Sequence, residues 1–329
     1  PQDYAAGKVE IAVLGNESPM LGNSPWLRPR DFVVLARRLW LKLNRSYGLA
    51  GDITDNLKDM QFAFDEYPAC ESCGSTDVRE VLVAADGNRV VECEHCGLWF
   101  TSPRVSEDVW KGWLLQDSER NREFTENRLK YGDPLARNIP LSFSFWWRIT
   151  RWRNQRHARE LLRMHGGRVR HIHDVGCGVG FFLKACQEMG LSVSGNDLNG
   201  YAVKRMRELF GFDVLIGELP DFLEQKDGSC EFDIVHMNDF IEHTYHPLRD
   251  LKCAHQMLSP GGLVYIRTFF VDSRKFEQLG DKWDMLMWNH VYHFSEKSLT
   301  RLIEQAGFGV KEIRRHEDTG IIEVFGIKP

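Results

Sequence analysis

The stretch HDVGCGVGFF at residues 173–182 decides the fold of this chain. An apolar run that begins at Val169 ends in Asp174, a glycine loop follows, and apolar residues with helical spacing come next. This order predicts a strand, a tight turn and a helix, the layout in which a nucleotide-like ligand meets the end of a parallel strand. Glycine has no Cβ, so the loop can adopt positive φ and ligand atoms can approach its backbone. Asp174 is placed to accept a hydrogen bond from an ammonium group over the loop.

The spacing of the glycines distinguishes this loop from a dinucleotide-binding loop. A dinucleotide site requires G-x-G-x-x-G, whereas here the third glycine comes one residue early and Phe181 holds the sixth position. A second apolar run, Leu191–Gly195, leads to Asp197 about twenty residues further on, where a carboxylate can accept both hydroxyls of a ribose. Later, SPGG at 259–262 breaks a helix just before an apolar run at 263–268, which predicts another strand.

In this order, the motifs resemble those of the class I S-adenosylmethionine (SAM) methyltransferases. The resemblance takes 174–180 as the first motif, Asp197 as the ribose acid, FDIVHMND at 232–239 as the fourth strand and its edge, and 259–262 as the turn before the fifth strand. It implies an α/β fold with a Rossmann-like, seven-stranded sheet whose last strand is antiparallel, and SAM as the cofactor. The cofactor-binding residues that it implies are Asp174, Gly176, Cys177, Gly178, Gly180, Phe181, Asp197, Leu198, Gly217, Glu218, Asn238, Asp239 and Phe240.

Length, charge and hydropathy narrow the class of protein further. With 329 residues, the chain is long enough for two domains or one large one. Its net charge of -5 argues against a protein wrapped in nucleic acid, although it leaves room for a local basic patch. No apolar run reaches membrane-spanning length and no signal-peptide pattern opens the chain, so we expect a cytoplasmic enzyme. We divide it into a helical segment, a zinc ribbon, a helical linker or lid and a methyltransferase domain, at 1–66, 67–104, 105–165 and 166–329.

Two C-x-x-C pairs predict a metal site in the first third of the chain. The spacing C-x2-C-x19-C-x2-C falls in the range of tetrahedral zinc sites, and Asp86-Gly87-Asn88 between the pairs predicts a hairpin turn. Four thiolates fill the coordination sphere, so the zinc is expected to be structural. Disulfides are the alternative, which a reducing compartment disfavours. The four predicted ligands are Cys70, Cys73, Cys93 and Cys96.

Three other segments each allow two interpretations. Residues 31–47 predict an amphipathic helix that packs on its own protein or a dimer mate, or else lies on a membrane or over the active site. Residues 98–100 pack the ribbon on its neighbour or stack on bases. We favour packing for both. The segment 105–165 predicts aromatic helices whose arginines either meet an anionic substrate group or form a solvated face. These are Arg148, Arg151, Arg153, Arg156, Arg159 and Arg163.

Candidate catalytic groups follow the predicted fourth strand. Methyl transfer from a sulfonium needs two reactants held in line and, for a hydroxyl nucleophile, a base. Asp239, Glu242 and His243 fall at i, i+3 and i+4, on one face if the segment is helical; Asn238 and His246 are close by. We take His243 as the first choice of base, with Asp239 beside it, because the ordinary pKa of histidine lies near working pH. The alternative is that His243 merely touches the cofactor or caps a helix.

Two further possibilities concern the same region. The stretch resembles the ubiquinone-pathway O-methyltransferases, in which carboxylates and a histidine at these places hold a divalent metal. Asp239, Glu242 and His243 are therefore an alternative metal site, although the acidic position before the Glu-His pair is shifted here. The family builds its substrate pocket wall between the fifth strand and the last helix, where His290 and His293 are candidates for a second base. Equally, these two histidines bond to the backbone and hold the loop in place.

The combination of a cysteine ribbon and a class I domain resembles bacterial methyltransferases of natural-product, deoxysugar and surface-glycan pathways. We therefore expect O-methylation of a small polar metabolite, sugar or natural-product intermediate, with an anionic substrate as one option and a homodimer as one option for the assembly. The alternatives are an RNA methyltransferase that uses the ribbon and the arginines, a deoxysugar C-methyltransferase, and a scaffold that binds SAM without catalysis. The chain lacks the [D/N]-P-P-[Y/F] motif of enzymes that act on amino nitrogens, which argues against the RNA alternative.

Overall fold

The structure is a computed structural model of the whole chain. The chain divides into two units, Pro1–Asn56 and Leu57–Pro329, and every element below belongs to the second. The predicted helix at 31–47 and Cys230 lie outside the described residues. The structure describes residues 62–116, 118–131, 143–226 and 231–329.

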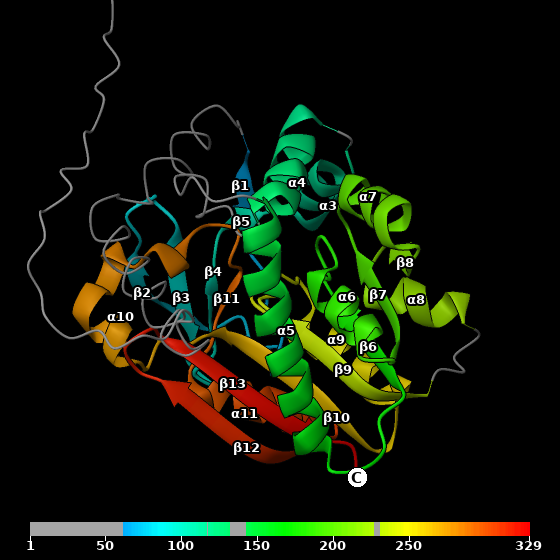
Figure 1. Cartoon of the computed structure of the whole chain (residues 1–329). Coiled ribbons are helices and arrows are strands. Elements are labelled where there is room, and N and C mark those ends of the chain that lie inside the picture. Colours follow the sequence, from blue (N-terminus) through cyan, green and yellow to red (C-terminus); the bar gives the residue numbers. More distant parts are fainter. Residues whose placement is uncertain (1–61, 117, 132–142, 227–230) are drawn as a thin grey trace, which may run out of the picture. The chain divides into compact units, whose positions relative to one another are not determined.

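A seven-stranded sheet forms the centre of the second unit (Figure 1). Its strands are β6 (His171–Val175), β7 (Ser192–Asp197), β8 (Asp213–Ile216), β9 (Phe232–Asn238), β10 (Leu258–Phe269), β12 (Gly309–His316) and β13 (Ile321–Ile327). They lie in the order β12-β13-β10-β9-β6-β7-β8. The five strands from β10 to β8 are parallel, whereas β13 runs antiparallel to both of its neighbours. The predicted class I fold, with its antiparallel last strand, is confirmed.

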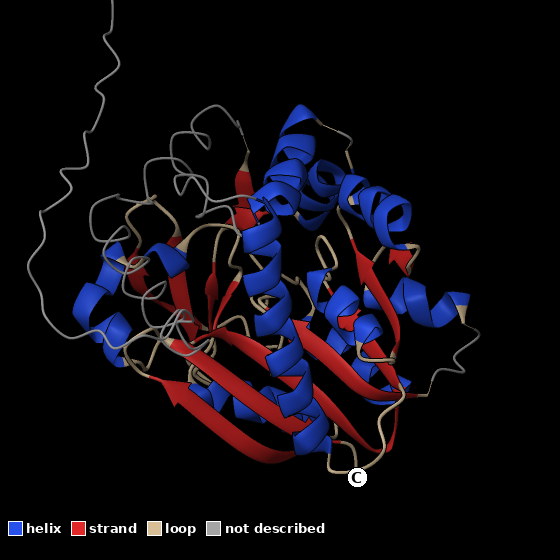
Figure 2. Ribbon diagram, in the orientation of Figure 1, coloured by secondary structure: helices blue, strands red, loops and turns tan. Residues whose placement is uncertain are grey.

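Helices cover both faces of this sheet (Figure 2). They are α5 (Phe143–His165), α6 (Phe181–Glu188), α7 (Gly200–Phe210), α8 (Leu219–Gln225), α9 (Pro247–Met257) and α11 (Glu296–Gln305). Successive strand residues alternate between the faces: Ile172 and Ile234 pack with α5 and α6, while Val175 and Val235 pack with α8, α9 and α11. Such two-sided burial is typical of parallel sheets. Truncation of a fully buried side chain such as Leu161 to alanine would cost about 2–5 kcal/mol.

Side-chain caps set the ends of the helices that border the site. Asn199 accepts a hydrogen bond from the backbone N–H of Ala202, 3.0 Å away, and so begins α7. Ser295 begins α11 in a reciprocal capping box with Ser298, as its position before the helical pattern predicted. The helix ends shortly before Gly307, whose φ of +99° favours glycine.

The segment before the sheet is helical, as predicted, and comprises α3 (Glu107–Leu115), α4 (Glu119–Tyr131) and α5. Ala158 and Leu161 of α5 are fully buried against the sheet, and Figure 1 shows the helix crossing over β10 and β13. The arginines of α5 are exposed: Arg151 pairs with Glu188, and Arg156 lies over the ring of Trp152. Their exposure agrees with the solvated-face interpretation, and contact with an anionic substrate group stays a prediction.

The cysteine ribbon, residues 67–104, forms the second sheet. Its strands are β2 (Val78–Val83), β3 (Arg89–Cys93) and β4 (Trp99–Thr101), and the predicted hairpin turn joins the first two. A fourth strand, β11 (Tyr292–His293), comes from the carboxyl-terminal half and pairs antiparallel with β4. Leu98 and Phe100 are buried at 1% exposure each, so these residues pack the ribbon on its neighbour and are not available to stack on bases.

Short elements join the ribbon to the rest of the unit. β1 (Phe64–Glu66) pairs with β5 (Arg104–Val105), and α10 (Arg274–Leu279) is followed by two 3-10 turns, η2 (Gly280–Lys282) and η3 (Asp284–Leu286). Within the described ranges, no helix is both long and apolar enough to cross a lipid bilayer.

Candidate functional site

The predicted cofactor residues lie at one edge of the central sheet. The glycine loop follows β6, Asp197 ends β7, Gly217 and Glu218 follow β8, and Asn238 ends β9. These four strands are neighbours in the order β9-β6-β7-β8, so their carboxyl ends meet side by side. This is the edge at which parallel α/β sheets bind nucleotide-like ligands. The contact of each residue with a cofactor stays a prediction.

The glycine loop is closely packed on one side and open on the other. Gly176, Gly178 and Gly180 all have positive φ, at 67°, 56° and 73°. A Cβ on Gly180 would lie 2.4 Å from Met206 Sδ, and one on Gly176 would lie 2.9 Å from the ring of Phe240. A Cβ on Gly178 would meet no atom of the described residues within 4 Å. The open side at Gly178 is thus the place where a ligand could approach the backbone, and the loop geometry fits SAM.

Asp197 holds this loop to the end of β7. Its Oδ2 accepts a hydrogen bond from Gly178 N at 2.7 Å, and its Oδ1 accepts one from Asn199 N at 2.7 Å. Burial raises the pKa of Asp197, while these two N–H donors lower it. Each carboxylate oxygen keeps a second lone pair, so Asp197 can accept from ribose hydroxyls while it supports the loop.

Asp174 is held from inside the sheet by two histidines that the sequence analysis did not single out. Asp174 Oδ1 lies 2.6 Å from Nδ1 of His236, its cross-strand neighbour, and both residues are about 95% buried or more, at 5% and 3% exposure. His236 Nδ1 donates to this carboxylate, and His236 Nε2 lies 3.1 Å from Nε2 of His157 on α5. The sequence signal that could have identified this contact is a polar residue, His236, in the middle of an otherwise apolar strand.

Phe182 and Tyr265 lie on either side of this pair. The ring of Phe182 stacks on His236 with centroids 4.0 Å apart, and the ring of Tyr265 stacks on it at 5.2 Å. Burial lowers the pKa of His157 well below its usual range, so this imidazole is neutral at neutral pH. The arrangement fixes which oxygen of Asp174 faces inward and leaves Oδ2 for a donor at the sheet edge.

Glu218 belongs to an ion-pair network at the rim. Lys111 of α3 contacts Glu218 Oε2 at 2.6 Å, and Arg249 of α9 donates to Glu218 Oε1 at 3.0 Å. His246 lies 3.1 Å from Glu107 of α3, which also pairs with Lys111. Both oxygens of Glu218 are therefore engaged in joining helices. Leu198 and Gly217 lie beside it at the ends of β7 and β8.

The segment after β9 forms a turn and not a helix. Residues 241–243 make a hydrogen-bonded turn, so the i, i+3, i+4 spacing does not place the three candidates on a helical face. Asp239 has a positive φ of 53° and its carboxylate pairs with Arg267 of β10. Asn238 donates its side-chain N–H to Asp239 Oδ2 at 2.9 Å. Asp239 is thus engaged at the sheet edge.

Instead, the turn brings Glu242 and His243 together with His290. One ligand-type atom of each lies within 4.8 Å of the others, and the rings of His243 and His290 are 4.5 Å apart. His243 Nδ1 donates to the carbonyl of Asn289 at 2.8 Å, and His290 Nδ1 donates to that of Met285 at 2.8 Å. Both Nε2 atoms therefore carry lone pairs, which can take up a proton or bind a metal ion.

Burial shifts the pKa of all three groups toward the neutral form. Desolvation lowers the pKa of His243 and lowers that of His290 well below its usual range. Burial, with the nearby charge of Asp239, raises the pKa of Glu242 to about 8. Glu242 Oε2 accepts from Thr268 at 2.9 Å, whereas buried Glu242 Oε1 and Asn289 Oδ1 have no hydrogen-bond partner in the described part of the chain. Two neutral imidazoles and these two polar oxygens suit a polar ligand.

His293 lies in β11 and faces the ribbon. Its Nε2 is 3.3 Å from the hydroxyl of Thr101, and burial lowers its pKa to about 3. Of the two candidates for a second base, only His290 is therefore brought to His243. The position of His293 agrees with the alternative given for it, in which it holds the loop in place.

The four ribbon cysteines converge on one point. The Sγ atoms of Cys70 and Cys96 are 3.4 Å apart, those of Cys73 and Cys93 are 3.5 Å apart, and all four lie within 4.8 Å of one another. No disulfide joins any cysteines of the described residues. Thiolates at about 2.3 Å from a tetrahedral zinc ion fit this spacing.

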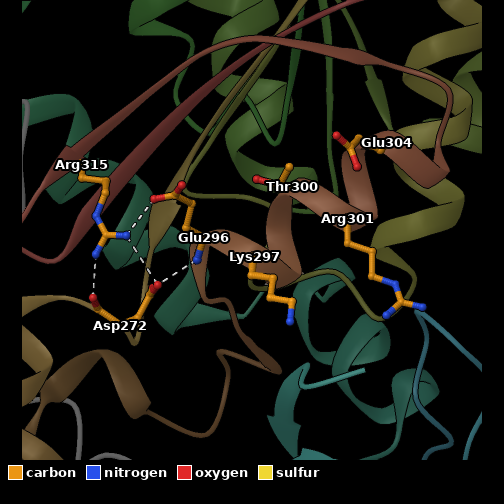
Figure 3. A pocket seen from close by; sticks show the side chains of 7 residues that line it. All are labelled: Asp272, Glu296, Lys297, Thr300, Arg301, Glu304 and Arg315. Carbon is orange, nitrogen blue, oxygen red and sulfur yellow. Dashed lines mark hydrogen bonds and ion pairs between the residues drawn. The ribbon is translucent and has the colours of Figure 1, made fainter. Parts of the chain in front are cut away.

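A shallow surface pocket of about 550 Å³ lies elsewhere (Figure 3). Its residues come from α11, β12 and the turn after β10, and include none of the predicted site residues. In this pocket Arg315 pairs with Asp272 and Glu296, so its positive charge is balanced by two carboxylates of the same pocket. The pocket lining comprises Asp272, Glu296, Lys297, Thr300, Arg301, Glu304 and Arg315.

The chain is similar to known proteins. The family model described as a methyltransferase domain matches residues 149–313, half of the chain, from within α5 to within β12. The ubiquinone biosynthesis O-methyltransferase of Pseudomonas paraeruginosa is 31% identical over 100 residues, which are 30% of this chain and 43% of that protein. The mitochondrial one of Mus musculus is 32% identical over 103 residues, 30% of this chain and 28% of its own. The chain thus spans less than half the length of these curated relatives.

Solved structures with lower sequence identity also match. The 1,6-didemethyltoxoflavin-N1-methyltransferase of Burkholderia thailandensis is 17% identical, with a TM-score of 0.45 over 76% of this chain and 99% of that one. A SAM-dependent methyltransferase from Archaeoglobus fulgidus is 18% identical, with a TM-score of 0.43 over 54% of this chain and 94% of its own. From the family match, together with the order and direction of the seven strands, the chain belongs to the methyltransferase domain family and carries a class I, SAM-dependent methyltransferase domain.

Proposed function

We propose that this protein transfers the methyl group of SAM to a hydroxyl oxygen of a small polar acceptor, with His243 as the general base. The observation that carries the proposal is the hydrogen bond from His243 Nδ1 to the carbonyl of Asn289, which directs the lone pair to Nε2. The curated relatives are named as O-methyltransferases, which supports oxygen as the acceptor atom.

The roles of the residues follow from the reaction. SAM supplies an electrophilic methyl carbon on a sulfonium that leaves as S-adenosylhomocysteine. The acceptor oxygen attacks that carbon as the S–C bond breaks, and His243 Nε2 takes up the hydroxyl proton. Burial lowers the pKa of His243, so the imidazole is neutral and ready to act as a base near neutral pH.

The polar character of the acceptor is inferred from the orphaned oxygens beside His243. Asn289 Oδ1 is a buried acceptor, and Glu242 Oε1 belongs to a carboxyl group that is protonated at neutral pH; neither atom has a hydrogen-bond partner among the described residues. An unpaired buried polar atom costs about 1–3 kcal/mol, so a ligand that accepts from the Glu242 carboxyl and donates to Asn289 Oδ1 would recover stability. A compound with two or more hydroxyl groups meets this requirement.

A panel of phenols, sugars and hydroxy acids, incubated with SAM, tests the proposal through S-adenosylhomocysteine formation. We expect His243→Ala to lower turnover by about 10²–10⁴-fold while S-adenosylhomocysteine affinity stays unchanged. His171→Ala, an exposed histidine on β6, is the matched control. Full turnover by His243→Ala would remove it as the base. Methylation of RNA alone, with salt-dependent binding, would favour the nucleic-acid alternative.

A metal-assisted variant of this reaction is the second candidate, because Glu242, His243 and His290 together make a plausible divalent-metal site. Here the ion would bind the acceptor hydroxyl and lower its pKa, in place of proton transfer to His243. Turnover that chelator abolishes and Mn²⁺ or Zn²⁺ restores would favour the metal. Turnover that survives chelator would favour the base.

For the ribbon, we propose one structural zinc ion bound by Cys70, Cys73, Cys93 and Cys96. The clustering of four thiols and the absence of an open position support this assignment. Metal analysis of the purified protein should find about one zinc per chain. A protein that is folded and active without zinc would contradict it.

A further inference from the structure

We propose that the cysteine ribbon is a working part of the acceptor site, with Asn88 and Thr101 as positioning residues for the histidine loop. We define the histidine loop as residues 281–293, which include Asn289 and His290. This inference rests on the proposed function of His243, because it concerns how the partner of that residue is held in place.

The hairpin turn of the ribbon forms hydrogen bonds with the first part of the histidine loop. Ala85 N donates to the carbonyl of Asp281 at 3.0 Å, and Trp288 N donates to Asp86 Oδ2 at 3.1 Å. Asn88 Nδ2 donates to the carbonyl of Leu286 at 2.9 Å. The turn predicted to close a hairpin thus also binds a segment about 200 residues away, as the separation of 198 between Asn88 and Leu286 shows.

Thr101 of β4 holds the second part of the loop. Its hydroxyl donates to the carbonyl of His290 at 3.1 Å and accepts from Asn88 Nδ2 at 3.0 Å. His293 Nε2 lies 3.3 Å away and donates to the same oxygen, while Thr101 N donates to the carbonyl of Val291 at 3.0 Å. Thr101 is 0% and Asn88 4% exposed, so water cannot replace these bonds without local opening.

The opposite side of the loop contacts the turn that carries the proposed base. The backbone N–H groups of Val291 and Tyr292 donate to the carbonyl of Glu242 at 2.8 and 3.3 Å. His243 Nδ1 donates to the carbonyl of Asn289. The loop is therefore held between the ribbon and the Glu242–His243 turn. A shift of the loop away from the ribbon would move the carbonyl that sets the tautomer of His243.

The same contacts show why the ribbon is not a detachable module. β11 completes its sheet, and Leu98 and Phe100 are buried in the core that also contains Val291 and Tyr292. The ribbon therefore restricts the position of His290 through the Thr101 hydroxyl on its carbonyl, and that of the next residue through the backbone bond from Thr101 N to Val291. A misplacement of about 1 Å in a catalytic constellation can cost about 10²-fold in rate.

Thr101→Val tests the proposal, because it removes the hydroxyl at nearly constant volume, whereas Thr101→Ser keeps the hydroxyl. For Thr101→Val we expect S-adenosylhomocysteine affinity within about twofold of wild type, and hydrogen exchange at the Val291 and Tyr292 amides at least about tenfold faster. The imidazole NMR signals of His243 should change as well. Thr101→Ser should restore both readouts, and Arg79→Ala on the exposed side of β2 is the control.

Turnover on any acceptor found in the panel adds a third readout. We expect kcat to fall by about 10–100-fold in Thr101→Val, with KM for SAM unchanged. If Thr101→Val does not fold, Asn88→Ser provides the second variant, with the same expectations. Wild-type exchange and wild-type His243 signals in a folded variant would overturn the proposal. The hydrogen-exchange and NMR readouts need no methyl acceptor. They therefore test the positioning role of the ribbon independently of whether His243 is the base.

Discussion

The cofactor half and the acceptor half of the site are built in opposite ways. The cofactor half consists of the loops after β6, β7, β8 and β9, in which each predicted residue is placed by its own strand or the turn that follows it. The acceptor half, comprising Glu242, His243, the histidine loop and the ribbon turn, joins segments up to 202 residues apart in sequence, as the Asp86–Trp288 bond shows. A site made of local motifs tolerates change elsewhere, whereas a site made of long-range contacts depends on every element that supplies one.

The largest effect is expected from removing a ribbon cysteine. Cys70→Ser should abolish metal binding and lower turnover about a hundredfold or more, because the ribbon sheet includes β11. Affinity for S-adenosylhomocysteine, measured by calorimetry, should stay within about twofold of wild type. Cys253→Ser, in a partly buried thiol on α9, is the control. A large loss of cofactor affinity in Cys70→Ser would show that the two halves are not separable.

Asp197→Ala should act on the cofactor half alone. It removes the acceptor for Gly178 N and the predicted partner of the ribose, so affinity should fall by about 1–3 kcal/mol, or roughly 5–150-fold. Calorimetry with S-adenosylhomocysteine measures this loss, and hydrogen exchange in the histidine loop should not change. Glu208→Ala on the surface of α7 serves as control. Unchanged affinity would remove Asp197 from the ribose.

Glu242 predicts a pH dependence of stability that belongs to the acceptor half. Its pKa rises from 4.5 to about 8 on folding, so the native state binds the proton more tightly than the unfolded state. Stability should therefore fall as pH increases between these two values, by roughly 1.4 kcal/mol for each unit. Urea unfolding at about pH 6 and about pH 7.5, with chelator present, measures the slope. Glu242→Gln should remove this contribution, and an identical slope would contradict the burial of a protonated carboxyl.

The smallest effect is expected at His236, which touches the cofactor half from behind. His236→Leu leaves Asp174 without its inward donor and should weaken S-adenosylhomocysteine binding by about 1 kcal/mol, or roughly fivefold. His236→Asn places an amide N–H near the position of Nδ1–H and should recover most of the affinity. Calorimetry of the pair separates a positioning role from general destabilisation. Equal affinity in all three proteins would show that Asp174 does not need His236.

The elements that sequence analysis predicted correctly are those with a local physical cause. Glycines at 176, 178 and 180 are required by positive φ, Ser295 begins α11 through its own side chain, and the hairpin turn at 86–88 follows from Asp-Gly chemistry. The seven-stranded sheet follows from apolar runs at the expected spacing, because two-sided burial imposes them. Each of these signals lies within a few residues of the feature that it predicts.

Two predicted site residues also take part in long-range ion pairs that the sequence did not indicate. Glu218 was predicted at the adenine rim and is engaged by Lys111 and Arg249 from two other helices. Asp239 was predicted beside His243 and pairs with Arg267 of the next strand, because the segment turns without forming a helix. Charged partners come from any part of the chain, so spacing within one segment cannot identify them.

The amino-acid sequence was sufficient for the class I sheet, the glycine loop and the cysteine ribbon, since backbone dihedrals, burial periodicity and thiol spacing are local properties. Only the tertiary structure brought His290 to His243 and placed the histidine loop against Asn88 and Thr101. The two-residue strand β11 carries no periodic signal, and its pairing with β4 is decided by which backbone groups are left to satisfy once the sheet and the ribbon have packed.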